Sequence, residues 1–294
     1  MITVCVASGK GGAGKTSLSA AIAERLGPSC VFADCDVDAA NGAIALGAKG
    51  TRSEPYFAGP GFEIDPAACT SCGACRAACR FGAIERANGS FRVVPELCER
   101  CGACLSRCPA EAIRTYEKQA GELLVSDSRL GMRIVHAELE PGEDTSGKLV
   151  AQVRGRAAEL AGEDAVIVVD APPGIGYPVI ASITGCDLVV VVVEASASGV
   201  RDAARLVELV GSMRRRAMAI VNKSGLNQAM DDAARAMLKE AGIPVAGEIP
   251  FDPALRSVEE SNRTWASLDG EAATRIRSAL CAVDGAIGAF REKR

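Results

Sequence analysis

Continuous apolar runs separated by helical patterns are the first regularity along the chain. Five such runs occur, at residues 2–8, 31–33, 165–169, 188–193 and 217–221. Because their apolar residues do not alternate with polar ones, they predict strands buried on both faces, as in a parallel sheet covered by helices. Helical periodicity lies between the runs, at about residues 15–26, 148–161, 200–213 and 228–241. We therefore predict an α/β fold with a mostly parallel sheet and right-handed crossovers.

Residues 55–118 interrupt this alternation with short turns, cysteines and Gly-Ala pairs. A stretch of this length has too little apolar area to fold unaided, so bound metal must supply much of its stability. We predict an inserted domain over 55–118 and a discontinuous main domain over 1–54 and 119–294. A hairpin that packs on the edge of the main domain is expected over 122–140.

Eight of the thirteen cysteines lie in two runs with the same spacing. The runs are Cys69-x2-Cys72-x2-Cys75-x3-Cys79 and Cys98-x2-Cys101-x2-Cys104-x3-Cys108-Pro109. This spacing is typical of small bacterial-type ferredoxins with two [4Fe–4S] clusters, in which the last cysteine of each run ligates the other run's cluster. The predicted ligand sets are Cys69, Cys72, Cys75 and Cys108 for one cluster, and Cys98, Cys101, Cys104 and Cys79 for the other. Two zinc sites are the alternative, which is disfavoured because zinc sites rarely use eight thiolates in this interleaved spacing.

The glycine-rich turn after the first strand has the pattern of a phosphate-binding loop, or P-loop. Residues 9–16 read Gly-Lys-Gly-Gly-Ala-Gly-Lys-Thr and stand between a strand and a helix, the context that this motif requires. Its glycines let backbone N–H groups surround phosphate oxygens at the positive end of the helix dipole. Lys15 is predicted to reach the β- and γ-phosphates of ATP, and the Thr16 hydroxyl to ligate Mg²⁺. The predicted nucleotide-binding residues are Gly11, Gly12, Ala13, Gly14, Lys15, Thr16 and Ser17.

A second lysine in this loop, Lys10, distinguishes it from a P-loop of the ordinary pattern. The sequence Lys-Gly-Gly-x-Gly-Lys-Thr resembles the deviant Walker A loop of the MinD/ParA superfamily of ATPases. Taken together, the chain resembles members of this superfamily that carry an inserted ferredoxin domain. The resemblance implies that Lys10 reaches across a dimer interface to the partner's nucleotide. It therefore implies an ATP-dependent homodimer, or a heterodimer with a paralogue.

Five further positions match motifs of the same superfamily. Asp36, at the end of the second predicted strand, resembles the acid of the first switch, which helps hold Mg²⁺ and orients the attacking water. Asp170 resembles the Walker B acid that binds the Mg²⁺ shell, and Gly174 would sense the γ-phosphate with its N–H. Asn222 stands where family members read adenine, and Pro250 lies in a loop that resembles the one closing over the base. The residues assigned to catalysis are Lys10, Lys15 and Asp36.

Composition narrows the range of partners. The formal net charge of -4 gives no basic face for nucleic acid, so no nucleic-acid partner is expected. No apolar run approaches the length of a membrane span, and we expect the apolar stripe over 274–290 to pack on the core rather than on a membrane. Cysteines in a chain without a recognisable leader indicate metal ligation in a reducing cytoplasm.

These features predict an ATP-binding and ATP-hydrolysing iron–sulfur protein. In it, a nucleotide-driven dimer switch would be coupled to electron transfer or to metallo-cofactor maturation of a client protein that the sequence does not identify. The first alternative is an assembly or carrier ATPase in which the clusters are cargo. Carriers of this kind use a short Cys-x2-Cys motif near the C-terminus, whereas Cys281 of this chain stands alone. This alternative is therefore disfavoured. A positioning ATPase on a membrane surface is the second alternative, disfavoured by the acidic charge.

Overall fold

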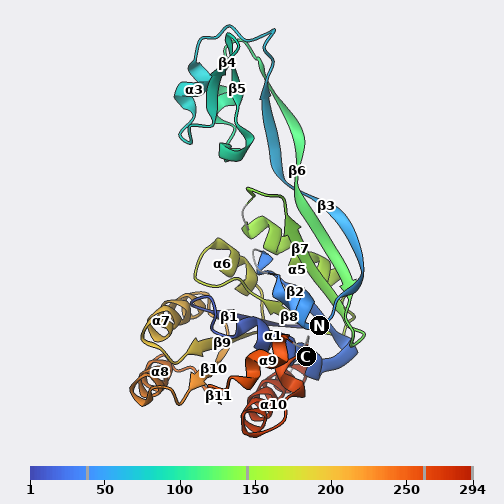
Figure 1. The fold of residues 1–294 in the computed structure, drawn as a ribbon, viewed down its shortest axis with the longest axis vertical. Helices are drawn as coiled ribbons and strands as arrows, with labels where there is room; N and C mark the ends of the chain where they lie inside the picture. Colours follow the sequence, from blue (N-terminus) through green and yellow to red (C-terminus); the bar gives the residue numbers. More distant parts are fainter. Residues whose placement is uncertain (38–39, 144–145, 261–262, 293–294) are drawn as a thin grey trace. The chain divides into compact units, whose positions relative to one another are not determined.

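A parallel sheet organises most of the chain. The structure is a computed structural model and describes residues 1–37, 40–143, 146–260 and 263–292. Within these residues a nine-stranded sheet has the order β11-β10-β9-β1-β8-β2-β7-β6-β3 (Figure 1). The pairs from β11 through to β7 are parallel, which confirms the predicted α/β sheet. The strands are β1 (Ile2–Ser8), β2 (Cys30–Asp34), β3 (Lys49–Ile64), β6 (Ile113–Asp127), β7 (Arg133–Leu139), β8 (Val166–Asp170), β9 (Leu188–Glu194), β10 (Ala217–Ser224) and β11 (Val245–Pro250).

Helices cover both faces of this sheet (Figure 1). The apolar side chains of α1 and α10 pack with Val4 and Val6 of β1 in one core, and α5 to α8 lie against the opposite face. Because both faces are covered, strands β1, β2 and β8 are buried along their whole length. The helices are α1 (Lys15–Leu26), α2 (Asn41–Ala45), α5 (Gly147–Leu160), α6 (Tyr177–Ile183), α7 (Ala197–Ser212), α8 (Gln228–Glu240), α9 (Ala254–Glu260) and α10 (Glu271–Arg291).

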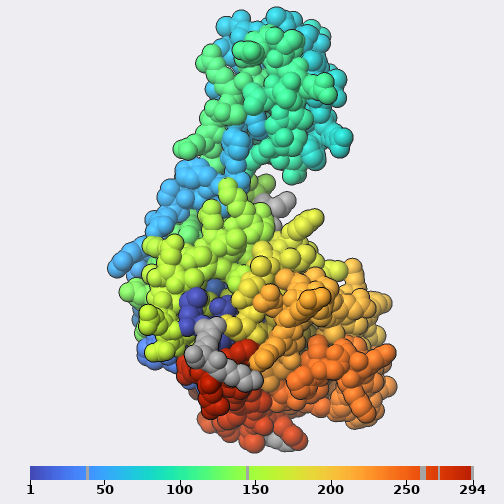
Figure 2. Space-filling model, turned by 180° about the vertical axis from the view of Figure 1, so that it is seen from behind, coloured from blue at the N-terminus to red at the C-terminus, as the bar shows by residue number. Residues whose placement is uncertain are grey.

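The C-terminal helix α10 packs on the core, as its apolar stripe predicts. Ile276, Leu280, Val283 and Ile287 are each no more than 2% exposed and belong to the same core as α1. Figure 2 shows the red C-terminal segment at the molecular surface. No helix among the described residues combines the length and the apolar character needed to cross a bilayer.

The chain divides into two compact units. Unit 1 comprises Met1–Glu54, Leu123–Glu138 and Thr145–Arg294, and unit 2 comprises Pro55–Glu122 and Leu139–Asp144. Unit 2 contains an antiparallel hairpin and two short helices around a small apolar core that includes Phe62, Ile84 and Phe91. Its elements are α3 (Ala74–Ala78), β4 (Ile84–Ala87), β5 (Ser90–Val93), the 3-10 turn η3 (Pro95–Leu97) and α4 (Ala103–Ser106).

Four strands, β3, β4, β5 and β11, and the first part of β6 were not predicted from the sequence. β3 and β6 are long strands that carry the chain into and out of unit 2, where the sequence predicts only short turns. The first seven residues of β3 are all exposed, and the strand contains Gly59-Pro60-Gly61, so neither apolar alternation nor β-propensity marks it. β11 is largely half-buried at the edge of the sheet, which also leaves little apolar pattern. β6 and β7 are neighbours in the sheet, as the expected hairpin over 122–140 requires.

The packing of α10 predicts a measurable effect on stability. Replacing Ile276, which is fully buried, by alanine should lower the free energy of unfolding by about 2–5 kcal/mol, since a cavity is left in the core. The exposed Ser278 on the same helix provides the control, and Ser278→Ala should stay within about 0.5 kcal/mol of wild type. Denaturant unfolding of the two variants measures the difference. Equal stability of both variants would contradict the packing of α10 on the core.

Candidate functional site

The P-loop joins the end of β1 to the start of α1 at the carboxyl edge of the parallel strands. Gly14 is the N-cap of α1 and has a left-handed backbone with φ of 89°. A side chain there would also meet the Nδ2 atom of Asn222 at 2.4 Å, so two constraints require glycine at this position. Gly14 offers no side-chain acceptor to the first amides of α1. Phosphate oxygens are the acceptors that such N-terminal amides bind.

Lys15 lies between two carboxylates at the centre of the site. Its Nζ is 2.9 Å from Asp170 Oδ1 and 3.1 Å from Asp36 Oδ2, and it donates to the Thr16 hydroxyl at 3.4 Å. Burial by itself lowers the pKa of Lys15, but Asp170 and Asp36 outweigh this effect and raise the pKa above its ordinary value. The structure thus brings together four residues from three separate parts of the sequence, all predicted to contact nucleotide or Mg²⁺.

A buried acidic pair stands behind Lys15. Asp34 and Asp170 are register partners on neighbouring strands, and both are 0% exposed. Burial and the nearby Asp170 raise the pKa of Asp34 well above its ordinary value. Among the described residues, Asp170 Oδ2 finds no hydrogen-bond partner although it is buried. An orphaned carboxylate oxygen beside a threonine hydroxyl fits Mg²⁺ or one of its water ligands, because Mg²⁺ takes oxygen ligands.

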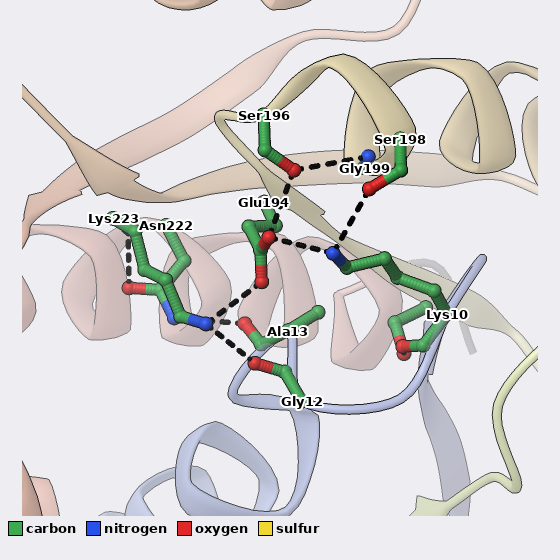
Figure 3. A network of polar contacts seen from close by, with 10 residues as sticks. Lys10, Gly12, Ala13, Glu194, Ser196, Ser198, Gly199, Asn222 and Lys223 are labelled. Carbon is green, nitrogen blue, oxygen red and sulfur yellow. Dashed lines mark hydrogen bonds and ion pairs between the residues drawn. The ribbon is translucent and has the colours of Figure 1, made fainter. Parts of the chain in front are cut away.

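Lys10 is held within its own chain by Glu194, a residue that the sequence analysis did not select. Lys10 Nζ donates to Glu194 Oε1 at 2.7 Å and to the Ser198 hydroxyl at 3.2 Å (Figure 3). Ser196 donates to the same Glu194 oxygen at 2.8 Å. Glu194 ends β9 at the carboxyl edge of the sheet, and this position after an apolar strand is the only signal that could have identified it.

Asn222 and Lys223 follow on β10 and attach that strand to the P-loop. Asn222 Nδ2 donates to the Ala13 carbonyl at 2.8 Å, and its Oδ1 accepts the Lys223 N–H at 2.9 Å. Lys223 Nζ donates to the Gly12 carbonyl at 2.8 Å and to Glu194 Oε2 at 2.7 Å (Figure 3). In this structure the side chain expected to read adenine is therefore 2% exposed and bonded to the loop itself.

These groups surround a cavity of about 840 Å³, within the ~300–1,000 Å³ common for small-molecule sites. The predicted residues that line it are Lys10, Gly11, Gly12, Gly14, Lys15, Thr16, Ser17, Asp36, Asn222 and Pro250. Phe251, which follows Pro250 in the loop predicted to close over the base, adds apolar surface, and so do Leu255 and Trp265, which the sequence analysis did not select. The Gly174 N–H, expected to sense phosphate, donates instead to the Ser8 carbonyl at 2.9 Å.

Comparison with known proteins identifies the family. Residues 4–265 match the family described as the CobQ/CobB/MinD/ParA nucleotide binding domain. The chain belongs to this family. The uncharacterized protein MJ0578 of Methanocaldococcus jannaschii is 33% identical over 229 residues, which are 77% of this chain and 80% of that protein. The MinD/ParA superfamily suggested by the P-loop is thereby confirmed.

Solved structures of similar fold agree with this assignment. The MinD cell division protein of Aquifex aeolicus has a TM-score of 0.57 at 20% identity, with 97% of this chain and 98% of that chain covered. The septum site-determining protein MinD of Pyrococcus horikoshii, complexed with Mg-ADP, has a TM-score of 0.60 at 16% identity, and the match covers 98% of this chain and 97% of that chain. An ATP complex of Cyanothece McdA has a TM-score of 0.59 at 16% identity, and the match covers 97% of this chain and 96% of that chain. At these identities the likeness extends to the P-loop fold alone.

Within this family member, unit 2 gathers the predicted cysteine ligands. Cys79, Cys98, Cys101 and Cys104, the second predicted set, line one small cavity together with Arg100. Of the other set, burial raises the pKa of the Cys75 thiol, and the nearby thiols of Cys108 and Cys69 raise it further. The Ala112 N–H donates to Cys108 Sγ at 3.3 Å, and Cys72 is exposed. None of the thirteen cysteines forms a disulfide in this structure.

The two cysteine runs have the same backbone. Left-handed residues recur at matched offsets after the first cysteine of each run. The matched pairs are Ser71 and Arg100 (φ 55° and 53°), Gly73 and Gly102 (76° and 72°), and Gly82 and Glu111 (66° and 50°). Alternation with left-handed residues turns successive N–H groups toward one centre, as in the anion-binding nests found at many Fe–S sites.

Four thiols in one cavity are a donor set that fits a [4Fe–4S] cluster. Among the described residues no three Cys, His, Asp or Glu side chains converge on a position for a single metal ion.

The contacts of Glu194 predict a pH-dependent contribution to stability. Burial alone would raise its pKa, but hydrogen bonds from Lys10, Lys223 and Ser196 lower it from 4.5 to about 2. A depressed acid pKa stabilises the fold above the unfolded value, and this stabilisation is lost as the pH falls from about 4.5 toward 2. Glu194→Gln should therefore lower the free energy of unfolding at pH 7 and pH 5 by about 1–3 kcal/mol. Denaturant titrations at pH 7, 5 and 3 should show a smaller difference from wild type at pH 3. A difference of the same size at all three pH values would refute the role of the charge.

Proposed function

We propose that the protein is a Mg²⁺-dependent ATPase with two [4Fe–4S] clusters in unit 2, and that nucleotide binding controls electron transfer to or from a client protein, or maturation of that client's metal site. The observation that carries this proposal is the occurrence of two sites in one chain. One is a P-loop lysine buried between two aspartates, and the other is a cavity lined by four cysteines. Neither site alone implies coupling, whereas their union in a single chain does.

Unit 1 has the residues that Mg-ATP requires. Lys15 would contact the β- and γ-phosphates, and Thr16 and Asp170 would hold Mg²⁺ directly or through water. The orphaned Asp170 Oδ2 and the N-terminus of α1, which has no side-chain cap, support this assignment. The Mg-ADP and the ATP bound by two proteins of the same fold favour these ligands here as well. Phe251 and Trp265 offer apolar surface for the base.

Hydrolysis would depend on positioning rather than on covalent chemistry. Bound Mg²⁺ would neutralise charge that develops on the phosphates. Asp36 would orient the attacking water, since its carboxylate lies beside Lys15 at the mouth of the cavity. The Gly174 N–H now donates to the Ser8 carbonyl, and in the nucleotide complex it would donate to the γ-phosphate instead. This change of acceptor would make the backbone contact a switch.

Lys10 supports a dimer as the active form. In the single chain its ammonium group is compensated by Glu194, and Lys10 also lines the nucleotide cavity. We infer that it leaves Glu194 and contacts the nucleotide of a second subunit, so that ATP closes a homodimer or a heterodimer with a paralogue. This is the function of a deviant Walker A lysine, and the loop sequence is what supports it here.

Unit 2 supports the redox part of the proposal. The ligand sets are the two crossed groups, Cys69, Cys72, Cys75 and Cys108, and Cys79, Cys98, Cys101 and Cys104. When bound, the clusters would supply one-electron transfer. The partly buried thiols and the N–H donor at Cys108 would hold them firmly, which favours electron transfer over delivery of the clusters as cargo.

Lys15 provides a direct test of the nucleotide site. The protein has a single tryptophan, Trp265, and it lines the cavity, so its fluorescence should report Mg-ATP binding. Lys15→Gln should weaken binding by roughly 10- to 150-fold, since a hydrogen bond to a charged group contributes about 1.5–3 kcal/mol. The exposed Lys239 on α8 gives the matched control, and Lys239→Gln should bind as wild type does. Equal dissociation constants for the two variants, both with a wild-type circular dichroism spectrum, would rule out the predicted role of Lys15.

The coupling is tested by an EPR-monitored redox titration of anaerobically purified protein, with and without Mg-ATP. Two one-electron couples are expected, and Mg-ATP should shift at least one of them by roughly 60 mV, which is about 1.4 kcal/mol. Lys15→Gln should abolish this shift. Protein without iron would disprove the cluster assignment and leave the ATPase intact. Two couples that ignore nucleotide would disprove the coupling.

A further inference from the structure

An ion-pair group in unit 2 lies outside the assignments made so far. Glu143 Oε1 accepts a charged hydrogen bond from Arg100 Nη2 and another from Lys118 Nζ, the latter at 2.9 Å. The side chains of Arg100 and Glu143 are only 14% and 12% exposed. Little water is therefore available to screen their charges. The group contains two cations and one anion, so it has a net positive charge. Because the group is half-buried, this charge acts on neighbouring side chains and on any ligand bound beside it.

Arg100 lies beside the cavity of the second cysteine group. It lines this cavity together with Cys79, Cys98, Cys101 and Cys104. Arg100 also has a left-handed backbone with φ of 53°, between Cys98 and Cys101. Its aliphatic stem runs past Gly59 of β3, where a side chain would meet Arg100 Cδ at 3.7 Å. The guanidinium is thus directed by its backbone and its neighbours and is not a freely mobile surface group.

Glu143 fixes the other end of the ion pair from a distant part of the sequence. The Glu140 N–H donates to the Ala120 carbonyl at 2.9 Å, which attaches this segment to β6. The Glu143 N–H donates to the Glu140 carbonyl at 3.0 Å, which closes a turn. Glu143 follows β7 and precedes α5, and both of those elements begin in unit 1 or lie in it. The anion that holds Arg100 therefore comes from a different part of the chain than the cysteine runs.

We propose that Arg100, held in place by Glu143, is a tuning residue that raises the reduction potential of the cluster bound by Cys79, Cys98, Cys101 and Cys104. This inference rests on the proposed cluster function. A cluster gains one negative charge on reduction, and a nearby cation stabilises that charge. In the other run the position that matches Arg100 holds Ser71, which carries no charge. The two clusters should therefore differ in potential, with the Arg100 cluster the easier to reduce.

The charges of the ion pair give opposite predictions for its two members. Arg100→Gln removes a positive charge and should lower one of the two midpoint potentials. Glu143→Gln removes a negative charge and should raise the same potential by a smaller amount, since Glu143 does not line the cavity. A purely structural ion pair would give shifts in one direction for both variants, because both break the same contact. The sign of the shift thus separates an electrostatic role from a structural one.

The experiment is an EPR-monitored redox titration of full-length anaerobic protein without nucleotide. Four proteins are compared with wild type: Arg100→Gln, Arg100→Lys, Glu143→Gln and the control Arg92→Gln. Arg92 is paired with Glu85 in the same unit, but its side chain is 67% exposed and it does not line the cysteine cavity. Iron and sulfide contents establish that each protein retains both clusters.

Arg100→Gln should change the equilibrium between the redox states of one cluster by roughly tenfold, which is 59 mV for one electron. Arg100→Lys should retain most of the wild-type potential, and Arg92→Gln should leave both couples unchanged. Shifts of the same sign in Arg100→Gln and Glu143→Gln, or no shift beyond that of Arg92→Gln, would overturn the proposal. If Arg100→Gln loses its cluster, Arg100→Lys and Glu143→Gln decide the question. Wild-type protein without clusters would overturn the proposed function as well, whereas two intact couples insensitive to Arg100 would overturn this inference alone.

Discussion

The ammonium group of Lys15 compensates carboxylates that the parallel sheet forces together. Strands β2 and β8 are neighbours in register, so Asp34 and Asp170 end at the same edge and are both buried. Asp36 lies two residues after Asp34, and its carboxylate contacts Lys15 as well. Three acids in a poorly hydrated site would repel one another, and the pKa of Asp34 is already raised by burial and by Asp170. Lys15 makes this arrangement tolerable, because an uncompensated buried charge costs several kcal/mol.

This compensation also explains why the site suits a metal nucleotide. Lys15 now serves as the cation for Asp170 and Asp36. A Mg²⁺ ion beside Asp170 would assume that task and leave the ammonium group available for phosphate. The exchange would replace one set of ion pairs by another and would not create uncompensated charge at any stage. The same principle applies at Glu194, whose carboxylate is shared by Lys10 and Lys223 and would keep one cation if Lys10 moved to a partner.

The sequence predicted the elements whose patterns arise from burial. The five apolar runs correspond to β1, β2, β8, β9 and β10, because strands covered on both faces need apolar residues at every position. The P-loop was predictable because its tight turn needs glycine at particular positions, which is a local requirement of the backbone. The pairing of Lys10 with Glu194 was not, since it depends on which strand lies beside β1. The contact of Asn222 with Ala13 was equally hidden, because 209 residues separate the two.

In unit 2, most of the cysteines that would bind the clusters also pack against the core, so they affect both chemistry and stability. Its core contains few large apolar side chains, and Cys69, Cys79, Cys98, Cys104 and Cys108 pack against that core. A unit of this size gains little stability from hydrophobic burial alone, so the proposed clusters, once bound by the thiols, would contribute to folding. The Arg100–Glu143 ion pair adds a tie between the cysteine run and residues beyond β7. Since this tie would act on the cluster and on the fold at once, a change at Glu143 would alter both. Within unit 2 this ion pair joins two segments that lie far apart in the sequence.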